Sequence, residues 1–254
     1  MKLSNDYLPG SLPLPAIRQI GHSAPLRWLA AAWQDMRANP LPSLAYGLLF
    51  ALGGDLILLS ALSHPHLVSV AISGFFLVAP LLAAGLYELS RARSRGERLL
   101  FIDSLRVFRA HGESMALFGL ILALICLFWE RFTAVAFSLF GQAGTQVYLP
   151  ALILSGDHGP LLLTWLLLGA VVAASVFAAS VVAVPLMLDR DADLATALMT
   201  SLRATAANPG PLLGWAVAIV ALTLFGFATL LFGLIVIMPL LGHASWHAYR
   251  ELVE

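Results

Sequence analysis

Five long runs of apolar residues constrain this chain more than any other feature of its sequence. They cover residues 41–62, 67–87, 115–137, 161–188 and 212–241. A helix needs roughly 20 mostly apolar residues to cross about 30 Å of hydrocarbon, so each of the first four runs has the length of one crossing. The fifth run is long for one ordinary span and short for two.

The composition agrees with these runs. Hydrophobic residues make up 60% of the chain and charged residues 11%, whereas a soluble domain carries about 25% charged residues. Such a chain cannot cover a water-facing surface of ordinary polarity, so lipid must surround much of it. The sequence therefore predicts an all-α fold, a polytopic membrane helical bundle.

A short motif repeats along the chain. Asn39-Pro40-Leu41-Pro42 recurs as Asn208-Pro209-Gly210-Pro211, and each copy follows an amphipathic stretch and opens an apolar run. The apolar positions of these stretches, with a degenerate third copy given last, are Leu26, Leu29, Trp33 and Met36; Leu194, Leu198 and Leu202; and Ile102, Leu105 and Phe108. Their helical spacing predicts short helices on the membrane surface, at residues 26–38 and 193–207 for the two clear copies.

A proline marks the second helix of each repeat unit: Pro80, Pro185 and Pro239. After a cytoplasmic tail at residues 1–24, repeat units of about 25–91, 97–188 and 192–250 fill a single membrane domain, 25–254. The prediction is six transmembrane helices as three hairpins, each preceded by a short interfacial amphipathic helix. The last hairpin would turn near residues 225–227. The alternative is one long helix kinked at Pro239, which gives five spans.

The basic residues predict the orientation. Of the 14 lysines and arginines, only Arg131 falls on the far side of the membrane in this arrangement. The others lie before the first run, between the second and third, between the fourth and fifth, and at the C-terminus. Because cytoplasmic loops carry an excess of basic residues, we expect a multi-pass protein of the bacterial inner (cytoplasmic) membrane with both termini in the cytoplasm.

Three charged residues fall inside the predicted spans. Asp55 lies about two-thirds of the way across the first span, and Glu130 and Arg131 lie at a similar depth in the third. Charges in hydrocarbon are costly, so such groups face the bundle and pair. We predict that Asp55 and Arg131 approach each other, with Glu130 on a different face. The contact is either a structural ion pair or part of a proton or ion pathway.

Two histidines, His243 and His247, share one face of the last helix because they are four residues apart. They are weak candidates for metal or haem ligation, since no third ligand is nearby. Histidines at an interfacial helix end are the simpler interpretation. The one cysteine, Cys126, has no second thiol with which to bind a metal. No residue set reaches the strength of a catalytic motif, so we expect no catalytic residue and no cofactor.

An arginine-rich segment follows the second run. Arg91, Arg93, Arg95 and Arg98 are expected to set the topology and to contact anionic lipid headgroups. Nearby acidic residues argue against nucleic-acid binding. After the fourth run, Asp193 is expected to cap the helix that follows it.

Three segments, at residues 184–193, 207–211 and 242–250, resemble a known family. They are similar to bacterial integral membrane proteins catalogued as domain of unknown function 2189. The resemblance extends over nearly the whole chain after the tail. It implies an inner-membrane location and assigns no activity.

The sequence favours a non-enzymatic accessory or scaffold protein, or one associated with lipid or envelope organisation. The expected partners are membrane lipids, together with another membrane protein or a second copy of this chain, and not nucleic acid. The alternative is a small-solute transporter or channel that uses Asp55, Glu130 and Arg131. A weaker alternative is a haem- or metal-binding accessory protein of a respiratory complex, using His243 and His247.

Overall fold

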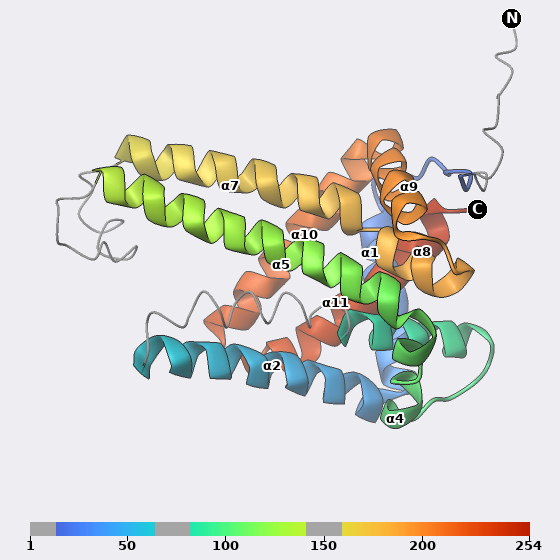
Figure 1. Ribbon diagram of the computed structural model, residues 1–254. Coiled ribbons are helices and arrows are strands. Elements are labelled where there is room, and N and C mark those ends of the chain that lie inside the picture. Colours follow the sequence, from blue (N-terminus) through green and yellow to red (C-terminus); the bar gives the residue numbers. More distant parts are fainter. Residues whose placement is uncertain (1–13, 64–81, 141–158) are drawn as a thin grey trace, which may run out of the picture.

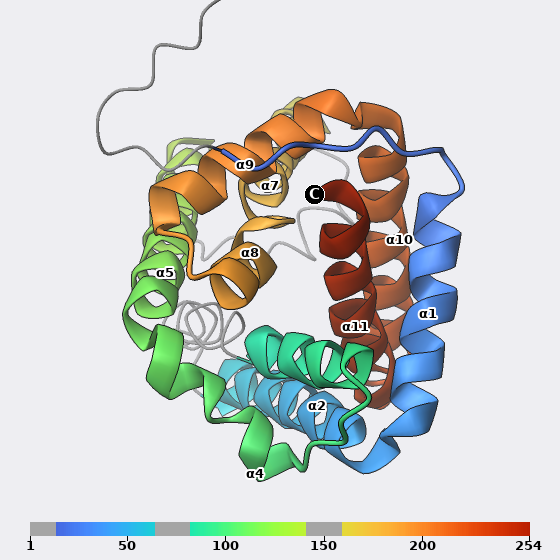
Figure 2. The same cartoon turned by 90° about the vertical axis from the view of Figure 1, so that its right-hand side faces the viewer.

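The computed structural model describes residues 14–63, 82–140 and 159–254. This part of the chain is helical apart from turns, short connections and one isolated antiparallel bridge between Ile17 and Val253, so the fold class is all-α. The helices in Figures 1 and 2 are α1 (Ala24–Ala38), α2 (Pro40–Ser63), an additional helix at residues 82–94, α4 (Phe101–Ser104), α5 (Val107–Phe140), α7 (Gly159–Ser180), α8 (Ala183–Arg190), α9 (Leu194–Ala207), α10 (Pro209–Ala228) and α11 (Leu234–Leu252).

Four segments in the described part of the chain are long and apolar enough to cross a membrane: Pro40–Leu59, Gly112–Ala136, Gly159–Arg190 and Pro209–Ala228. They correspond to the first, third, fourth and fifth apolar runs. α7 buries none of its residues inside the protein, which is the behaviour of a helix that lipid surrounds. The predicted span at residues 67–87 lies mostly outside the described residues, and α11, the second helix of the last predicted hairpin, is not among the four. The count of six therefore stays a prediction.

The fifth apolar run forms two helices, α10 and α11, separated by turns at residues 229–233. Leu230 and Leu231 have positive φ angles of 52° and 68°. Side chains rarely adopt this left-handed conformation, and a right-handed helix cannot continue through it. The alternative of one continuous helix kinked at Pro239 is therefore wrong. The turn lies at residues 229–233, a few residues after the expected position at 225–227.

α1 and α9 lie across one end of the long helices (Figures 1 and 2), and the two helices predicted at the Asn-Pro motifs are confirmed. Small residues such as Ala32 and Ala204 face the protein and are fully buried, because they allow close approach to neighbouring helices. Four large apolar side chains point outward instead: Leu26, Trp33, Met199 and Leu202.

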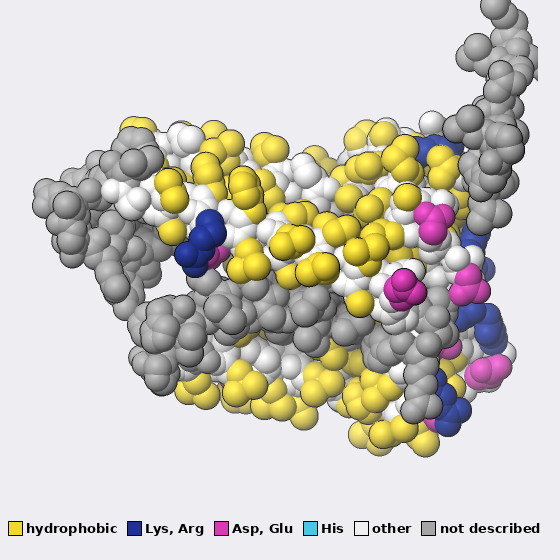
Figure 3. Space-filling model, viewed as in Figure 1, with side chains coloured by type: hydrophobic (Ala, Val, Ile, Leu, Met, Phe, Trp, Pro, Cys, Tyr) yellow, Lys and Arg dark blue, Asp and Glu magenta, His cyan; other side chains and the backbone are white. Residues whose placement is uncertain are grey.

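The degenerate third copy does not form one helix. Ile102 lies in α4 and is exposed, Leu105 lies in the turn that follows, and Phe108 lies at the start of α5. Most charged side chains in Figure 3 lie along the right-hand end of the view, and apolar side chains make up most of the other coloured surface, apart from one group of dark blue and magenta atoms. The sequence indicated that charged residues gather at one end of the long helices, and the fold has this arrangement.

Residues 14–23 pack against other parts of the chain and do not form a loose tail. Arg18 N donates a hydrogen bond to Leu252 O at 2.9 Å. Asn208, between α9 and α10, holds the same segment: its Nδ2 donates to Arg18 O at 2.9 Å and its Oδ1 accepts from Ile20 N at 2.8 Å. The N-terminal segment and the C-terminus therefore lie together. The first 13 residues of the expected tail lie outside the described part.

Glycines let α2, helix 82–94 and α11 pack closely. A methyl group on Gly47 would overlap the backbone carbonyl of Ile235. A methyl group on Gly85 would overlap the Tyr46 phenol, and Tyr46 is fully buried. These contacts set the register between the three helices, and this register brings polar side chains from each of them to one place.

Candidate functional site

Six polar side chains meet where four helices converge. They are Asp35 of α1, Ser43 of α2, Ser90 and Arg93 of helix 82–94, and His243 and His247 of α11, and we call them the Asp35 network. Asp35, Ser43, Ser90 and His243 are each at most 6% exposed. Buried polar groups are costly without hydrogen-bond partners, and the network supplies these partners.

Asp35 reaches the network because it lies on the buried face of α1. It follows Trp28 and Ala32 at helical spacing, and all three are buried. Asp35 Oδ1 accepts from Arg93 Nε at 3.1 Å, while Oδ2 contacts Ser90 Oγ at 2.6 Å and His247 Nε2 at 2.9 Å. The carboxylate thus joins α1 to two other helices.

Two opposing effects act on the Asp35 carboxyl. Burial opposes its ionisation, but the hydrogen bonds from His247 and Ser90 outweigh burial, with a further contribution from the charges of His247 and His243. The pKa of Asp35 is therefore lowered from its ordinary value, and the group is a carboxylate at neutral pH. Arg93 Nη1 also donates to Gln34 O, so the guanidinium is held on both sides.

His243 lies at the centre of the network, beyond the apolar first half of α11. Its Nδ1 is 2.7 Å from Ser90 Oγ and its Nε2 is 2.9 Å from Ser43 Oγ. Burial is the main reason that the pKa of His243 is lowered, to about 4, and it outweighs the attraction of the Asp35 carboxylate. The imidazole is therefore neutral at pH 7, with one nitrogen donating and the other accepting.

The network forms one hydrogen-bonded chain from Ser43 through His243 and Ser90 to Asp35. Such a chain can hold a proton in a defined position. Both serine hydroxyls are buried, so no substrate reaches them in this conformation. The chain's physical effect is to connect α1, α2, helix 82–94 and α11.

The metal hypothesis for His243 and His247 finds no support in this geometry. Both ring nitrogens of His243 are taken by serine hydroxyls, and His247 Nε2 is bonded to Asp35. Within residues 14–63, 82–140 and 159–254, no group of three or more His, Cys, Asp or Glu residues is placed to hold a metal ion.

A second polar cluster surrounds Asp189 of α8, whose side chain is 13% exposed. Its Oδ2 accepts from Tyr249 Oη at 2.8 Å and from Arg250 Nη1 at 3.2 Å, both on α11. Its Oδ1 lies 3.5 Å from Arg91 Nε on helix 82–94. Asp189 therefore links α8 to two other elements.

These contacts change the expectation for the four arginines. Arg91 also pairs with Glu88 at 3.2 Å, and Arg93 pairs with Asp35. These two guanidinium groups are thus turned toward carboxylates of the protein, whereas Arg95 and Arg98 are exposed. Contact with lipid headgroups therefore remains a prediction for the exposed Arg95 and Arg98.

The predicted pairing of Asp55 with Arg131 is not found among the described residues. Arg131 Nε instead lies 2.6 Å from Glu130 Oε2, its neighbour on α5. Glu130 and Arg131 lie on different faces of α5, since they are consecutive residues of a helix, but their long side chains bend together outside it. Asp55 is half-buried on α2.

Sequence reasoning missed Asp35, Ser43 and Ser90. Asp35 carried a signal: a carboxylate on one face with Trp28 and Ala32 is unusual for an amphipathic helix. The two serines carried none, because a lone serine in an apolar helix is common. By contrast, the predicted helix cap is confirmed: Asp193 Oδ1 accepts from Thr196 N at 3.0 Å.

Comparison with known proteins gives a family and no relative. Residues 67–189 match the family model described as predicted integral membrane protein (DUF2189). This is the family that the motifs resemble, but the match covers just under half of the chain, and residues 207–211 and 242–250 lie beyond it. No curated protein and no solved structure matches the chain.

Proposed function

We propose that this chain, an integral membrane protein with a match to the DUF2189 family, is a non-enzymatic accessory or scaffold protein of the bacterial inner membrane, acting on lipid or envelope organisation. One observation carries the proposal. The transverse helices α1 and α9 expose large apolar side chains at the charged end of the bundle, including Leu26 (72% exposed) and Met199 (52% exposed).

An exposed apolar stripe beside basic residues is the pattern of a helix lying in the membrane interface. On α1 the exposed Trp33 ring lies 5.0 Å from the Arg37 guanidinium carbon, and both groups favour the headgroup region. On α9 the exposed Leu202 neighbours the exposed Arg203. The Asp35 network then fixes α1 to the spans, as a scaffold requires.

Six spans in three hairpins, with both termini cytoplasmic, complete the proposed arrangement. The pairing of residues 14–23 with the C-terminus favours an even number of crossings. The repeat is supported by its two asparagines. Asn39 and Asn208 have similar backbone angles (φ −140°, ψ 67° and φ −133°, ψ 51°), and each side chain donates to an extended segment elsewhere in the chain.

Reporter fusions test this topology. A fluorescent protein after Glu254 should fluoresce, and alkaline phosphatase inserted near Asp157 should be active. Fusions that report an external C-terminus would overturn the six-span arrangement.

Copurification tests the function. After mild detergent extraction, the intact protein should retain a defined lipid class or a stoichiometric membrane partner. The same retention should be reduced in a variant of the exposed stripe, Leu26→Ser with Trp33→Ser, and kept in Leu213→Ser, which alters an exposed leucine of α10. A stripe variant that retains everything the wild type retains would refute the proposal.

A transporter is the second candidate, and the half-buried carboxyl of Asp55 in a span favours it. Purified protein in proteoliposomes would then carry a proton or ion flux that Asp55→Asn abolishes and Asp103→Asn, at the charged end, leaves intact. No flux above that of empty vesicles would remove this candidate.

A further inference from the structure

The structure holds a small hollow beside the Asp35 network that faces outward. It lies between the C-terminal end of α1 and the chain that follows helix 82–94, and its volume is about 120 Å³. That volume holds several waters or one phosphate group, and not an acyl chain. Its polar lining includes Asp35, Asn39, Arg93 and Arg98.

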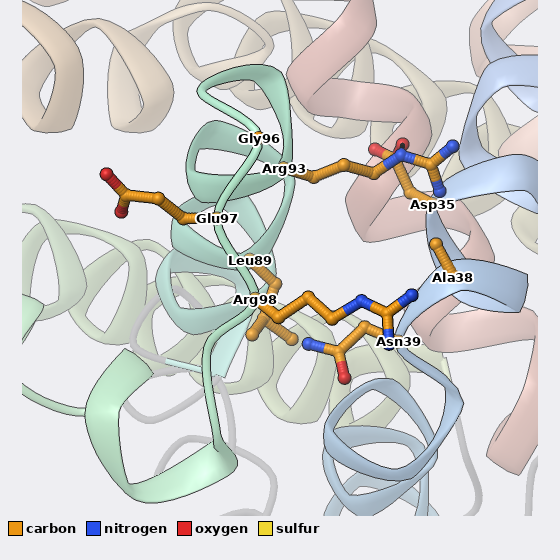
Figure 4. Close-up of a pocket in the computed structure, with 8 residues that line it drawn as sticks. All are labelled: Asp35, Ala38, Asn39, Leu89, Arg93, Gly96, Glu97 and Arg98. Carbon is orange, nitrogen blue, oxygen red and sulfur yellow. Dashed lines mark ion pairs between the residues drawn. The ribbon is translucent and has the colours of Figure 1, made fainter.

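Figure 4 shows how the charges are directed. Arg93 and Arg98 both extend toward α1, while Glu97 extends away from it. The Asp35 carboxylate is already bonded to Arg93, Ser90 and His247. Arg98 forms no ion pair with a carboxylate of the described residues. Asp35, Arg93 and Arg98 together carry one net positive charge, and Glu97, the other charged residue of the lining, directs its carboxylate away from α1.

The Asp35 contact also prepares Arg93 for a ligand. Its Nε and Nη1 are held by Asp35 and by the Gln34 carbonyl. Its Nη2 makes no hydrogen bond within residues 14–63, 82–140 and 159–254. A guanidinium held in this way loses little side-chain freedom when it binds an anion.

Exposed apolar side chains flank the hollow. Asn39 Nδ2 donates to Leu99 O at 2.7 Å, which places the next residues beside the start of α2. Leu41, Leu100 and Ile102 are 80%, 70% and 69% exposed. An apolar rim does not strengthen the binding of a free anion, whereas a phospholipid has both a phosphate for the arginines and acyl chains for the apolar side chains.

From these observations we propose that the Arg93–Arg98 hollow binds the phosphate of an anionic phospholipid, whose acyl chains lie over Leu41, Leu100 and Ile102. The proposal rests on the proposed interfacial position of α1. Asn39 directly precedes the candidate span Pro40–Leu59, so the hollow lies at the depth where headgroup phosphates occur. Charge-assisted hydrogen bonds from two arginines would hold the phosphate.

Thermal unfolding of the full-length protein in a neutral detergent tests the proposal. Dioctanoyl phosphatidylglycerol should raise the unfolding temperature of the wild type and of Arg106→Gln, the matched control, since Arg106 is exposed, pairs with Asp103 and does not line the hollow. In Arg98→Gln the lipid concentration for half the effect should rise at least about tenfold. Arg98→Lys should give an intermediate value.

Three outcomes would overturn it. Arg98→Gln could respond as the wild type does, or dioctanoyl phosphatidylcholine could act as strongly as phosphatidylglycerol. Inorganic phosphate alone could also reproduce the whole effect, which would identify a free anion as the ligand. If Arg98→Gln fails to fold, native mass spectrometry of lipid adducts on the wild type and Arg98→Lys decides instead. If one of these outcomes occurs while the Leu26→Ser, Trp33→Ser variant still shows reduced retention, lipid binding in the hollow is refuted and the proposed function is not.

Discussion

Ser90 Oγ lies 2.7 Å from Nδ1 of His243, and the same hydroxyl donates its only proton to Asp35 at 2.6 Å. His243 must therefore donate from Nδ1 to Ser90. Ser43 Oγ lies 2.9 Å from both Nε2 of His243 and Asn39 O, so its single proton serves one of these two acceptors. The tautomer of one buried imidazole thus follows from a serine on another helix. Four predictions test this arrangement and the packing around it.

Removing the Ser90 hydroxyl should destabilise the fold. Ser90→Ala leaves both Asp35 and His243 short of a buried partner, so we expect a loss of about 2 kcal/mol in the free energy of unfolding. Tryptophan fluorescence during unfolding in mixed micelles measures this loss. The control is Ser94→Ala: the exposed Ser94 hydroxyl bonds only to Arg91 O, so its loss should stay within about 0.5 kcal/mol. Equal effects would contradict the network.

Acid should weaken the fold in a window that His243 determines. Its pKa is about 4 in the folded protein and near 6.5 when exposed, so the unfolded chain binds the proton first. Stability is then complete above about pH 6.5 and falls as the pH approaches 4, by roughly 3 kcal/mol. Asp35, whose pKa is lowered, adds a further loss below its ordinary pKa of 3.8.

The pH dependence of unfolding in the same micelles checks this expectation. His243→Asn should be less stable at pH 7 and should lose the slope between pH 6.5 and 4. His22→Gln, which changes an exposed histidine, should keep the wild-type slope. A slope unchanged in His243→Asn would assign the acid loss to other groups.

Close packing of α2 on α11 should make Gly47 intolerant of a methyl group. The added carbon would overlap the Ile235 carbonyl oxygen, which is backbone and cannot turn aside, so Gly47→Ala should cost about 1–3 kcal/mol. Gly112→Ala is the control, because a methyl there meets nothing within 4 Å. That change should be neutral or stabilise the helix by up to about 1 kcal/mol. The free energies of unfolding of the two variants test this prediction. A Gly47→Ala variant as stable as the wild type would refute the close approach of α2 to α11 at Gly47 and Ile235.

The Asp189 cluster should matter more than surface ion pairs. Asp189→Asn removes the charge that holds Arg91 and Arg250, and we expect a loss of about 1–2 kcal/mol because the carboxylate is mostly buried. Asp103→Asn is the control, since its partner Arg106 is 77% exposed. That loss should be below about 0.5 kcal/mol. Double-mutant cycles with Arg250→Gln would locate the coupling on Asp189, and no coupling would contradict it.

Local features of the sequence predicted several elements of this protein correctly. The apolar runs predicted four of the described helices from their length alone, since a span is a property of one continuous segment. The Asn-Pro motifs predicted where α1 and α9 end, because proline disfavours helix in the residue before it. Asp193 predicted its own cap through a contact only three residues away.

Contacts between distant residues were decided only by the tertiary structure. Which face of α1 is buried, and hence the position of Asp35, depends on the partner helices and not on the apolar spacing within α1. Asp35 and His247 are 212 residues apart in the chain. They meet because close contacts such as Gly47 against Ile235 set the register of α11. Run length and spacing are encoded locally, whereas register arises when all the helices pack together, and register decides which charges pair.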